Sequence, residues 1–163
     1  MRRPYSSSRF LDLLQFIREM LPAAGLGTDV LAGFPGESDE DFERTCDVIR
    51  QSPLSYLHVF PFSAREGTAA YLMPEQVSPA IIRARSRTLR DISQAKNIAF
   101  RRQFIGRVLK GITLAKEEEM GEGVVLTENY IHARIPQCSV APNRLVNVRI
   151  EEAGPQLTRA TIV

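Results

Sequence analysis

The chain has 163 residues, of which 44% are hydrophobic and 25% charged, and its formal net charge at pH 7 is +2. That length is enough for one ordinary domain or two small ones, each with a core of its own. No apolar run approaches the roughly 20 residues that a membrane helix needs, and the start lacks the layout of a signal peptide, so we expect a soluble, cytoplasmic protein without a membrane partner.

The first part of the chain predicts an amphipathic helix, a strand and a second helix. The apolar run that begins at Gly27 ends in a Gly-Phe-Pro-Gly-Glu turn at residues 33–37. Glycine lets a main chain turn sharply and approach a ligand closely, and proline biases the residue before it toward extended geometry. Ser38 with Asp41 three residues later is typical of a capped helix start, so we expect a helix over 38–51. A ligand-binding turn and an ordinary strand-to-helix connection both remain open on this motif alone.

A second apolar strand is predicted over 54–63, again closed by a proline, and a long helix over 78–104. The helix is predicted because its apolar residues recur at roughly helical spacing. A strand, a helix and another strand in succession indicate a βαβ-like segment. We therefore expect an α/β fold in this part of the chain.

Positive charge is concentrated in the middle of the chain. Residues 53–104 carry eight Lys and Arg against three Asp and Glu. Within the predicted long helix only Asp91 balances the cations, which are Arg83, Arg85, Arg87, Arg90, Lys96, Arg101 and Arg102. A basic helix face is usually solvated surface, but the missing carboxylates favour attraction to phosphates, which gives salt-dependent affinity without sequence preference.

After Phe104 the pattern changes to short β-rich runs, which favour a small closed barrel or a sandwich. The runs are 105–114, 123–127, 130–135, 144–150 and 156–163. In this part Tyr130 could stack on a base, and Arg134 could follow it along an RNA backbone. The alternative is that Glu128 and Asn129 form a hairpin turn and that Tyr130 is a half-buried strand residue.

The histidines and cysteines do not predict a catalytic or metal site. His58 and His132 each stand singly in an apolar strand and are expected to be packed strand residues. His58 also lies in a strand whose carboxyl end could face an active site. Cys46 and Cys138 are isolated and predict free thiols rather than a disulfide or a metal site.

The order, spacing and identities of these segments resemble the second half of the radical S-adenosylmethionine barrel in the methylthiotransferases, enzymes that place a methylthio group on transfer RNA or on a ribosomal protein. The last part resembles their TRAM domain, a small OB-like barrel that binds RNA. The resemblance implies an α/β fold in two parts. Residues 1–104 would form the C-terminal half of a partial (β/α) barrel that ends in a basic helix, and residues 105–163 an all-β TRAM barrel.

Several short sequence segments are most similar to the methylthiotransferase branch that acts on threonylcarbamoyladenosine. The similarity rests on residues 57–63, Arg65, Gly67-Thr68 and 127–130, whereas Ala64 and Glu66 depart from the usual pattern. The implied reaction adds a methylthio group at C2 of N6-threonylcarbamoyladenosine 37 by radical chemistry. The branches that act on isopentenyladenosine or on a ribosomal aspartate remain alternatives.

The resemblance also implies cofactor contacts. Family members use S-adenosylmethionine and two 4Fe-4S clusters, but the Cys-x3-Cys-x2-Cys loop is absent here, so we expect no catalytic residue and no metal ligand in this chain. Arg3 matches an arginine that can contact the carboxylate of S-adenosylmethionine. Gly33 and Phe34 match the strand end beside the adenine, and Phe60 and Phe62 match positions that frame the same ring.

The implied partners are the tRNA anticodon loop and the missing N-terminal half of the enzyme. The residues expected to contact RNA are Arg83, Arg87, Arg90, Arg101, Arg102, Tyr130 and Arg134. By itself the chain is expected to be inactive. A stand-alone RNA-binding module without catalysis remains open, as does a half-barrel that associates with a separate N-terminal polypeptide and so covers its unpaired strand edge.

Overall fold

The computed structural model describes residues 4–114, 122–136 and 138–163. Its contacts divide the chain into two compact units, one ending at Lys96 and the other beginning at Asn97. The division falls inside the long helix.

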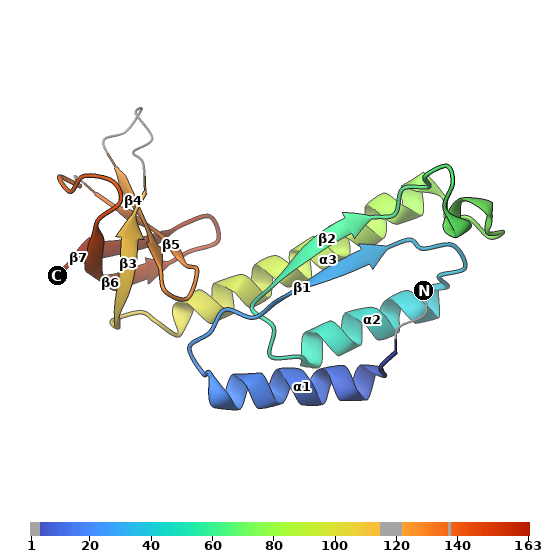
Figure 1. Ribbon diagram of the computed structural model, residues 1–163, viewed down its shortest axis with the longest axis horizontal. Helices are drawn as coiled ribbons and strands as arrows, with labels where there is room; N and C mark the ends of the chain where they lie inside the picture. Colours follow the sequence, from blue (N-terminus) through green and yellow to red (C-terminus); the bar gives the residue numbers. More distant parts are fainter. Residues whose placement is uncertain (1–3, 115–121, 137) are drawn as a thin grey trace. The chain divides into compact units, whose positions relative to one another are not determined.

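The first unit is an α/β structure, as predicted (Figure 1). It contains a two-stranded parallel sheet in which Gly27 lies opposite Tyr56 and Ala32 opposite Pro61. Its elements in chain order are α1 (Ser7–Met20), β1 (Gly27–Ala32), α2 (Asp39–Gln51), β2 (Tyr56–Pro61), the 3-10 helix η1 (Ala69–Leu72) and the part of α3 (Pro79–Arg102) that ends at Lys96.

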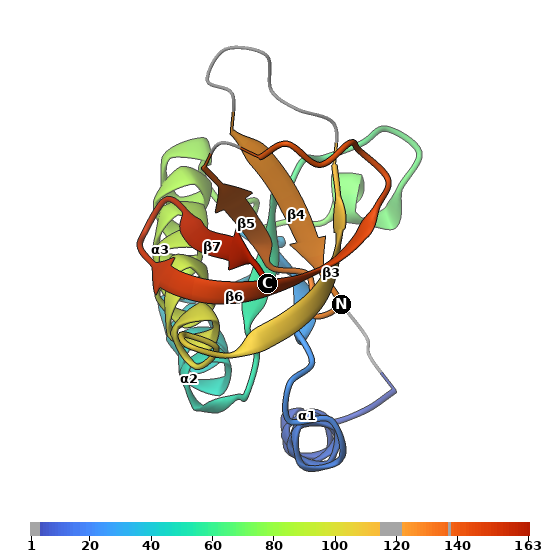
Figure 2. The ribbon, with the colours of Figure 1, turned by 90° about the vertical axis from the view of Figure 1, so that its left-hand side faces the viewer.

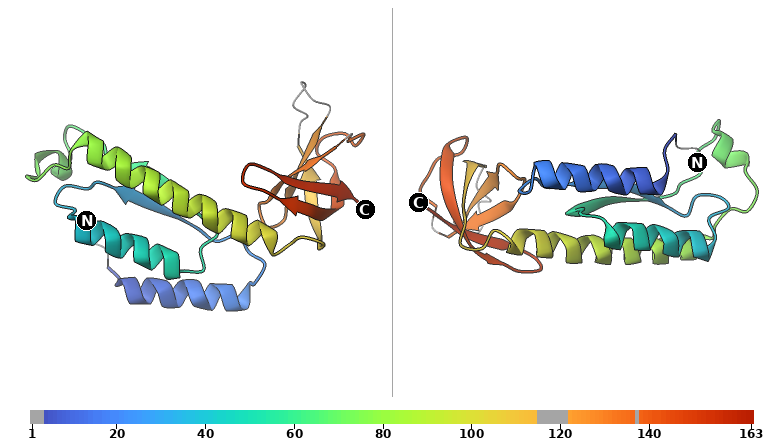
Figure 3. Two further views of the ribbon diagram at one scale, coloured as in Figure 1. Left: turned by 180° about the vertical axis from the view of Figure 1, so that it is seen from behind. Right: turned by 90° about the horizontal axis from the view of Figure 1, so that it is seen from below.

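Helices α2 and α3 cover one face of this sheet (Figure 3). The core between them is apolar and includes a buried thiol. Its buried residues are Leu14, Ala32, Phe42, Cys46, Ile49, Leu54, Leu57 and Leu89. Because side chains alternate along a strand, the paired residues Asp29 and His58 point to the opposite face, together with Leu31 and Phe60. No described helix covers that face, and Phe60 is 52% exposed there.

The predicted start of α2 is confirmed by its capping geometry. The Ser38 hydroxyl accepts from the Asp41 backbone N–H at 3.1 Å, and the Asp41 carboxylate accepts from the Ser38 N–H at 3.3 Å. These reciprocal bonds satisfy two of the donors that a helix start leaves free. The hydrogen bonds from Ser38 also lower the pKa of the Asp41 carboxyl.

The second unit is a closed five-stranded barrel, which confirms the small barrel expected from the sequence (Figure 2). The strands pair in the order β3-β4-β5-β7-β6. Their bounds are β3 (Val108–Thr113), β4 (Gly123–Thr127), β5 (His132–Ile135), β6 (Leu145–Ala153) and β7 (Thr158–Ile162).

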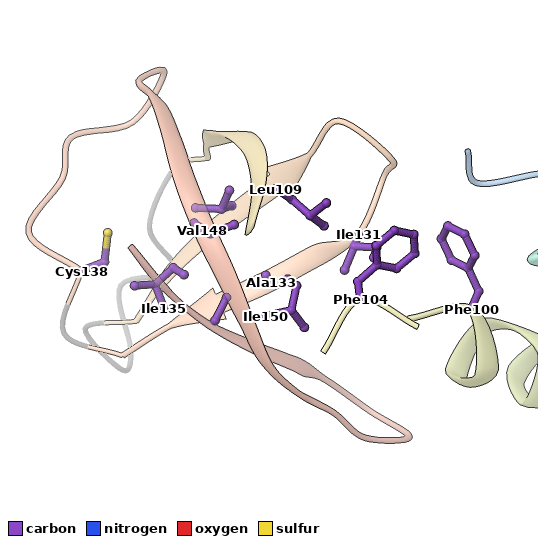
Figure 4. Close-up of a cluster of buried hydrophobic side chains, with 11 residues drawn as sticks. Phe100, Phe104, Leu109, Ile131, Ala133, Ile135, Cys138, Val148 and Ile150 are labelled. Atoms are coloured by element: carbon purple, nitrogen blue, oxygen red, sulfur yellow. The ribbon is translucent and has the colours of Figure 1, made fainter. Parts of the chain in front are cut away.

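The last turns of α3 belong to the barrel unit. Phe100 in α3 and Phe104, two residues after its end, are both buried, and their rings meet edge to face with centroids 5.1 Å apart. They join the barrel core shown in Figure 4, whose other labelled members are Leu109, Ile131, Ala133, Ile135, Cys138, Val148 and Ile150. This helix end therefore stabilises the barrel through apolar packing. Among the helices of the described part of the chain, none is long and apolar enough to cross a membrane.

Candidate cofactor and RNA-binding sites

The turn that follows β1 requires glycine at its first position. Gly33 has a φ of 81°, in the left-handed region. A β-carbon there would clash with Cγ1 of Ile82. The Gly33 N–H donates to Oε2 of Glu37 at 2.8 Å, which closes the turn onto its own last residue. The chain therefore leaves the carboxyl end of β1 with a bare, tightly held backbone.

Arg85 from α3 fixes this turn from behind. It is only 6% exposed, and its guanidinium donates to Oε2 of Glu37 and to Oδ1 of Asp39, at 2.7 Å each. It also donates to the Glu37 carbonyl at 2.9 Å and lies 5.3 Å from the centre of the Phe42 ring. Burial lowers the pKa of Arg85, but the hydrogen bonds to Asp39 and Glu37 together raise it by more than burial lowers it. The pKa of Arg85 is therefore raised.

This network corrects the expectation that Arg85 lies on the outer face of the basic helix. Its balancing carboxylates come from Glu37, in the turn before α2, and from Asp39, the first residue of α2, rather than from its own helix. Sequence reasoning missed the pair, although the acidic residues at the start of the second predicted helix were a signal that an arginine could use.

Phe34 and Phe62 meet at the carboxyl ends of the two strands. Their ring centroids lie 5.6 Å apart in an edge-to-face arrangement. The Phe62 N–H donates to the Ala32 carbonyl at 2.8 Å, so the parallel pairing continues beyond β2. The structure thus brings Gly33, Phe34 and Phe62 together, and Phe60 points from the uncovered face of the same strand. Arg3 lies outside the described residues.

The expectation that both histidines are packed strand residues is wrong. His58 and His132 are exposed. The His58 ring contacts that of Tyr56 edge to face, with centroids 5.2 Å apart, on the uncovered face of the sheet. Within the described residues, no group of three or more His, Cys, Asp and Glu side chains is arranged to hold a metal ion.

Three of the predicted RNA contacts form one exposed row. Arg83, Arg87 and Arg90 are exposed on α3, and their spacing of four and three residues places them on one helix face. None of the three forms an ion pair with a described residue. Arg102 is also exposed, although its Nε donates weakly to the Ala153 carbonyl at 3.4 Å.

Arg101 does not lie on the exposed face, which corrects its predicted role. It is 8% exposed, and its guanidinium donates to the Thr158 hydroxyl and to the Asn97 side chain at 2.8 Å each. Burial, and then the charge of Arg102, lower its pKa. Lys96 is engaged in a similar way, because its ammonium donates to the carbonyls of Arg50 and Ser52. The hydrogen bonds of Lys96 and Arg101 therefore stabilise the fold.

Tyr130 is 75% exposed in the turn between β4 and β5. The prediction of a turn at Glu128 and Asn129 is confirmed, whereas the half-buried alternative for Tyr130 is wrong. Arg134, on β5, is partly buried and forms an ion pair with Glu122 at 3.1 Å. Its charge is therefore already compensated within the barrel.

Comparison with known proteins places these features in context. The chain is 35% identical over 131 residues to a threonylcarbamoyladenosine tRNA methylthiotransferase of Aquifex aeolicus, which covers 80% of this chain and 30% of the relative. It is 33% identical over 162 residues to a tRNA-2-methylthio-N(6)-dimethylallyladenosine synthase of Paenarthrobacter aurescens, covering 94% of this chain and 32% of the relative. The protein of that name from Acidothermus cellulolyticus is 34% identical over 156 residues, covering 95% and 29%.

The chain therefore spans about a third of the length of the curated relatives that it matches. No family model matches the chain.

Proposed function

Because this chain is homologous to the C-terminal region of the radical S-adenosylmethionine tRNA methylthiotransferases, we propose that it forms the C-terminal part of such an enzyme and presents tRNA to the reaction site. The observation that carries the proposal is the homology over 80% or more of the chain. An α/β unit followed by a closed five-stranded barrel agrees with that assignment. In this proposal the domains are residues 1–104 and 105–163.

The carboxyl ends of β1 and β2 would form the adenine side of an S-adenosylmethionine pocket. The residues fit a flat ring, because Gly33 presents backbone without a β-carbon, and Phe34, Phe60 and Phe62 offer aromatic surface beside it. The network of Glu37 and Arg85 would hold that backbone in place before the ligand arrives. Arg3 would offer its planar fork to the ligand carboxylate. When bound, S-adenosylmethionine would supply the radical chemistry.

The described residues do not fit an iron-sulfur cluster. The two cysteines, Cys46 and Cys138, are both buried, and each lies in the apolar core of a different unit. Cluster ligands in the proposed enzyme would therefore come from residues outside this chain.

RNA binding is assigned to two surfaces. One is the row of Arg83, Arg87 and Arg90 on α3, because exposed arginines that form no ion pair with a described residue can neutralise phosphates. Arg102, in the second unit, is proposed as a separate contact. The other is the barrel surface around Tyr130. Arg101 and Arg134 are not part of the proposal.

For the substrate nucleoside we propose threonylcarbamoyladenosine. The support is the relative from Aquifex aeolicus, which is named for that nucleoside, together with the short sequence segments of this chain that resemble that branch. Dimethylallyladenosine is the second candidate, because other similar relatives are named for it.

The test is binding of this chain to an anticodon stem-loop that carries threonylcarbamoyladenosine, across a salt series. Controls are the same loop with dimethylallyladenosine, the unmodified loop and an unrelated hairpin. Preference for the first loop with a steep salt slope supports both the function and the nucleoside. Preference for the second loop changes the nucleoside, and binding without preference leaves a general RNA module. Absence of binding by the folded chain overturns the RNA-presenting role.

A further inference from the structure

A row of aliphatic side chains crosses the outer surface of the barrel. Ile112 on β3 pairs with Leu126 on β4 and with Leu145 on β6, so the three lie side by side on one face of the sheet. Leu145 is 85% exposed. A surface hollow of about 350 Å³ lies over this row, and Tyr130 is among its lining residues. The exposed Leu145 and Tyr130 make this hollow a candidate binding surface.

The turn that carries Tyr130 is rigidly built. The buried Thr127 hydroxyl accepts from the Ile131 N–H at 2.9 Å and donates to the buried Asn129 side chain at 2.6 Å. The Tyr130 N–H donates to the Thr127 carbonyl at 2.9 Å, and the Glu128 N–H donates to the Lys110 carbonyl at 2.8 Å. The tyrosine is therefore held beside the hollow by backbone and buried polar groups rather than by packing of its own ring.

Fold stability does not explain a tyrosine at this position. Tyr130 has a φ of 64°, where glycine or asparagine costs less. Its ring is mostly exposed, so burial returns little of that cost. A strained backbone that presents an aromatic side chain to solvent is typical of a binding site.

The charges around the hollow favour a nucleic acid over an apolar peptide. Lys110 lines the hollow, and Arg144 directly precedes Leu145. Both side chains are exposed, and neither forms an ion pair with a described residue. Among the described residues that line the hollow, Glu128 is the one acidic residue. Lys110 beside the apolar floor, and Arg144 next to Leu145 in the sequence, suit a base with its phosphates.

We propose that this hollow binds a nucleobase of unpaired RNA, which stacks on Tyr130 and rests on the row formed by Leu145, Ile112 and Leu126. The inference rests on the proposed RNA-presenting function and adds the place and the state of the RNA. A paired base cannot enter, because both of its faces are covered within a duplex. Lys110 and Arg144 would contact the flanking phosphates.

The first experiment uses a fluorescent reporter at the site. The chain contains no tryptophan, so Tyr130→Trp creates a sole indole whose emission should be quenched when a base stacks on it. The probes are a short unpaired oligoadenylate and a blunt RNA duplex of equal length. Tyr71→Trp, at another exposed tyrosine in the first unit, is the matched control. We expect quenching by the unpaired RNA for Tyr130→Trp alone.

A second pair of variants separates binding from folding. Tyr130→Gly should weaken binding of the unpaired RNA by about tenfold, and it should raise the unfolding midpoint or leave it unchanged, because glycine relieves the strained backbone. Leu145→Ser should weaken binding in the same direction, whereas Leu72→Ser, at an equally exposed leucine of the first unit, should not.

The outcomes distinguish this site from the proposed function. If the chain binds RNA but Tyr130→Trp is not quenched and Tyr130→Gly binds normally, the site is wrong and the proposed function stands. If duplex and unpaired RNA quench equally, the nucleobase site is also wrong. If the folded chain binds no RNA, both fail. Quenching of the Tyr130→Trp emission by a short apolar peptide, and not by RNA, would also overturn the nucleobase assignment.

Discussion

One carboxylate oxygen of Glu37 joins two distant parts of the first unit. It accepts the backbone N–H of Gly33 at 2.8 Å and a guanidinium N–H of Arg85 at 2.7 Å. The arginine lies 48 residues further along the chain. The turn at the end of β1 is therefore stabilised by the long helix behind it, and changes on that helix should reach the proposed cofactor surface.

Arg85→Met should lower the free energy of unfolding by about 3 kcal/mol, because it leaves the largely buried Glu37 carboxylate without its cation. Urea unfolding followed by circular dichroism measures the loss. Arg44→Gln is the control, since Arg44 is exposed and its ion pairs are worth less than about 1 kcal/mol. Equal losses for the two variants would refute the structural role of Arg85.

Gly33→Ala should destabilise the chain by about 3 kcal/mol, the sum of a left-handed backbone and a clash with Ile82. Gly67→Ala isolates the first part, because Gly67 has the same φ of 81° and nothing within 4 Å of its would-be β-carbon. We expect about 1 kcal/mol there. In an Ile82→Ala background, the cost of Gly33→Ala should fall to that of Gly67→Ala, and a cost that stays the same would exclude the clash.

Ser38→Ala should lower the free energy of unfolding by about 1 kcal/mol, because α2 loses its N-terminal cap. The Asp41 carboxyl has a lowered pKa in the folded chain, so its stabilising contribution is present above its ordinary pKa of about 3.9 and is lost as the pH falls through the lower folded value. Unfolding curves of the original chain and of Asp41→Asn should therefore differ near pH 6 and converge as the pH falls through the lowered pKa of the folded chain. A difference that does not change with pH would contradict this account.

Arg101→Met should destabilise the barrel unit by about 2 kcal/mol, because Thr158 is fully buried and loses its donor. The same change should leave the salt dependence of RNA binding unaltered. Thermal unfolding and a salt series measure the two effects. Arg102→Gln, at the neighbouring exposed position, should show little loss of stability. If Arg101→Met instead left stability unchanged and reduced the salt dependence of RNA binding, Arg101 would be an RNA contact.

Replacing Arg83, Arg87 and Arg90 together by glutamine should weaken RNA binding and reduce the steepness of its salt dependence. Each phosphate contact with single-stranded RNA contributes about 0.7 to the slope of log K against log salt concentration, so loss of three contacts should reduce it by about 2. The charge-matched control changes Arg9, Arg44 and Arg65, which are exposed elsewhere in the first unit. An equal effect of the two triple variants would mean that only net charge matters.

The sequence by itself determined the elements that depend on near neighbours. The cap formed by Ser38 and Asp41, the turn at Gly33 and the alternation of the barrel strands involve residues a few positions apart, so their physics is visible in the order of the residues. The α/β fold followed by a small barrel was predictable for that reason.

Only the tertiary structure decided which side chains are available for binding. Arg85 and Arg101 look like Arg83 and Arg87 in the sequence, but their partners come from 46 to 57 residues away, at Glu37, Asp39 and Thr158. The row of Ile112, Leu126 and Leu145 likewise arises from three strands in register. Burial and pairing depend on contacts between distant segments, and helical or strand periodicity contains no information about where those segments meet.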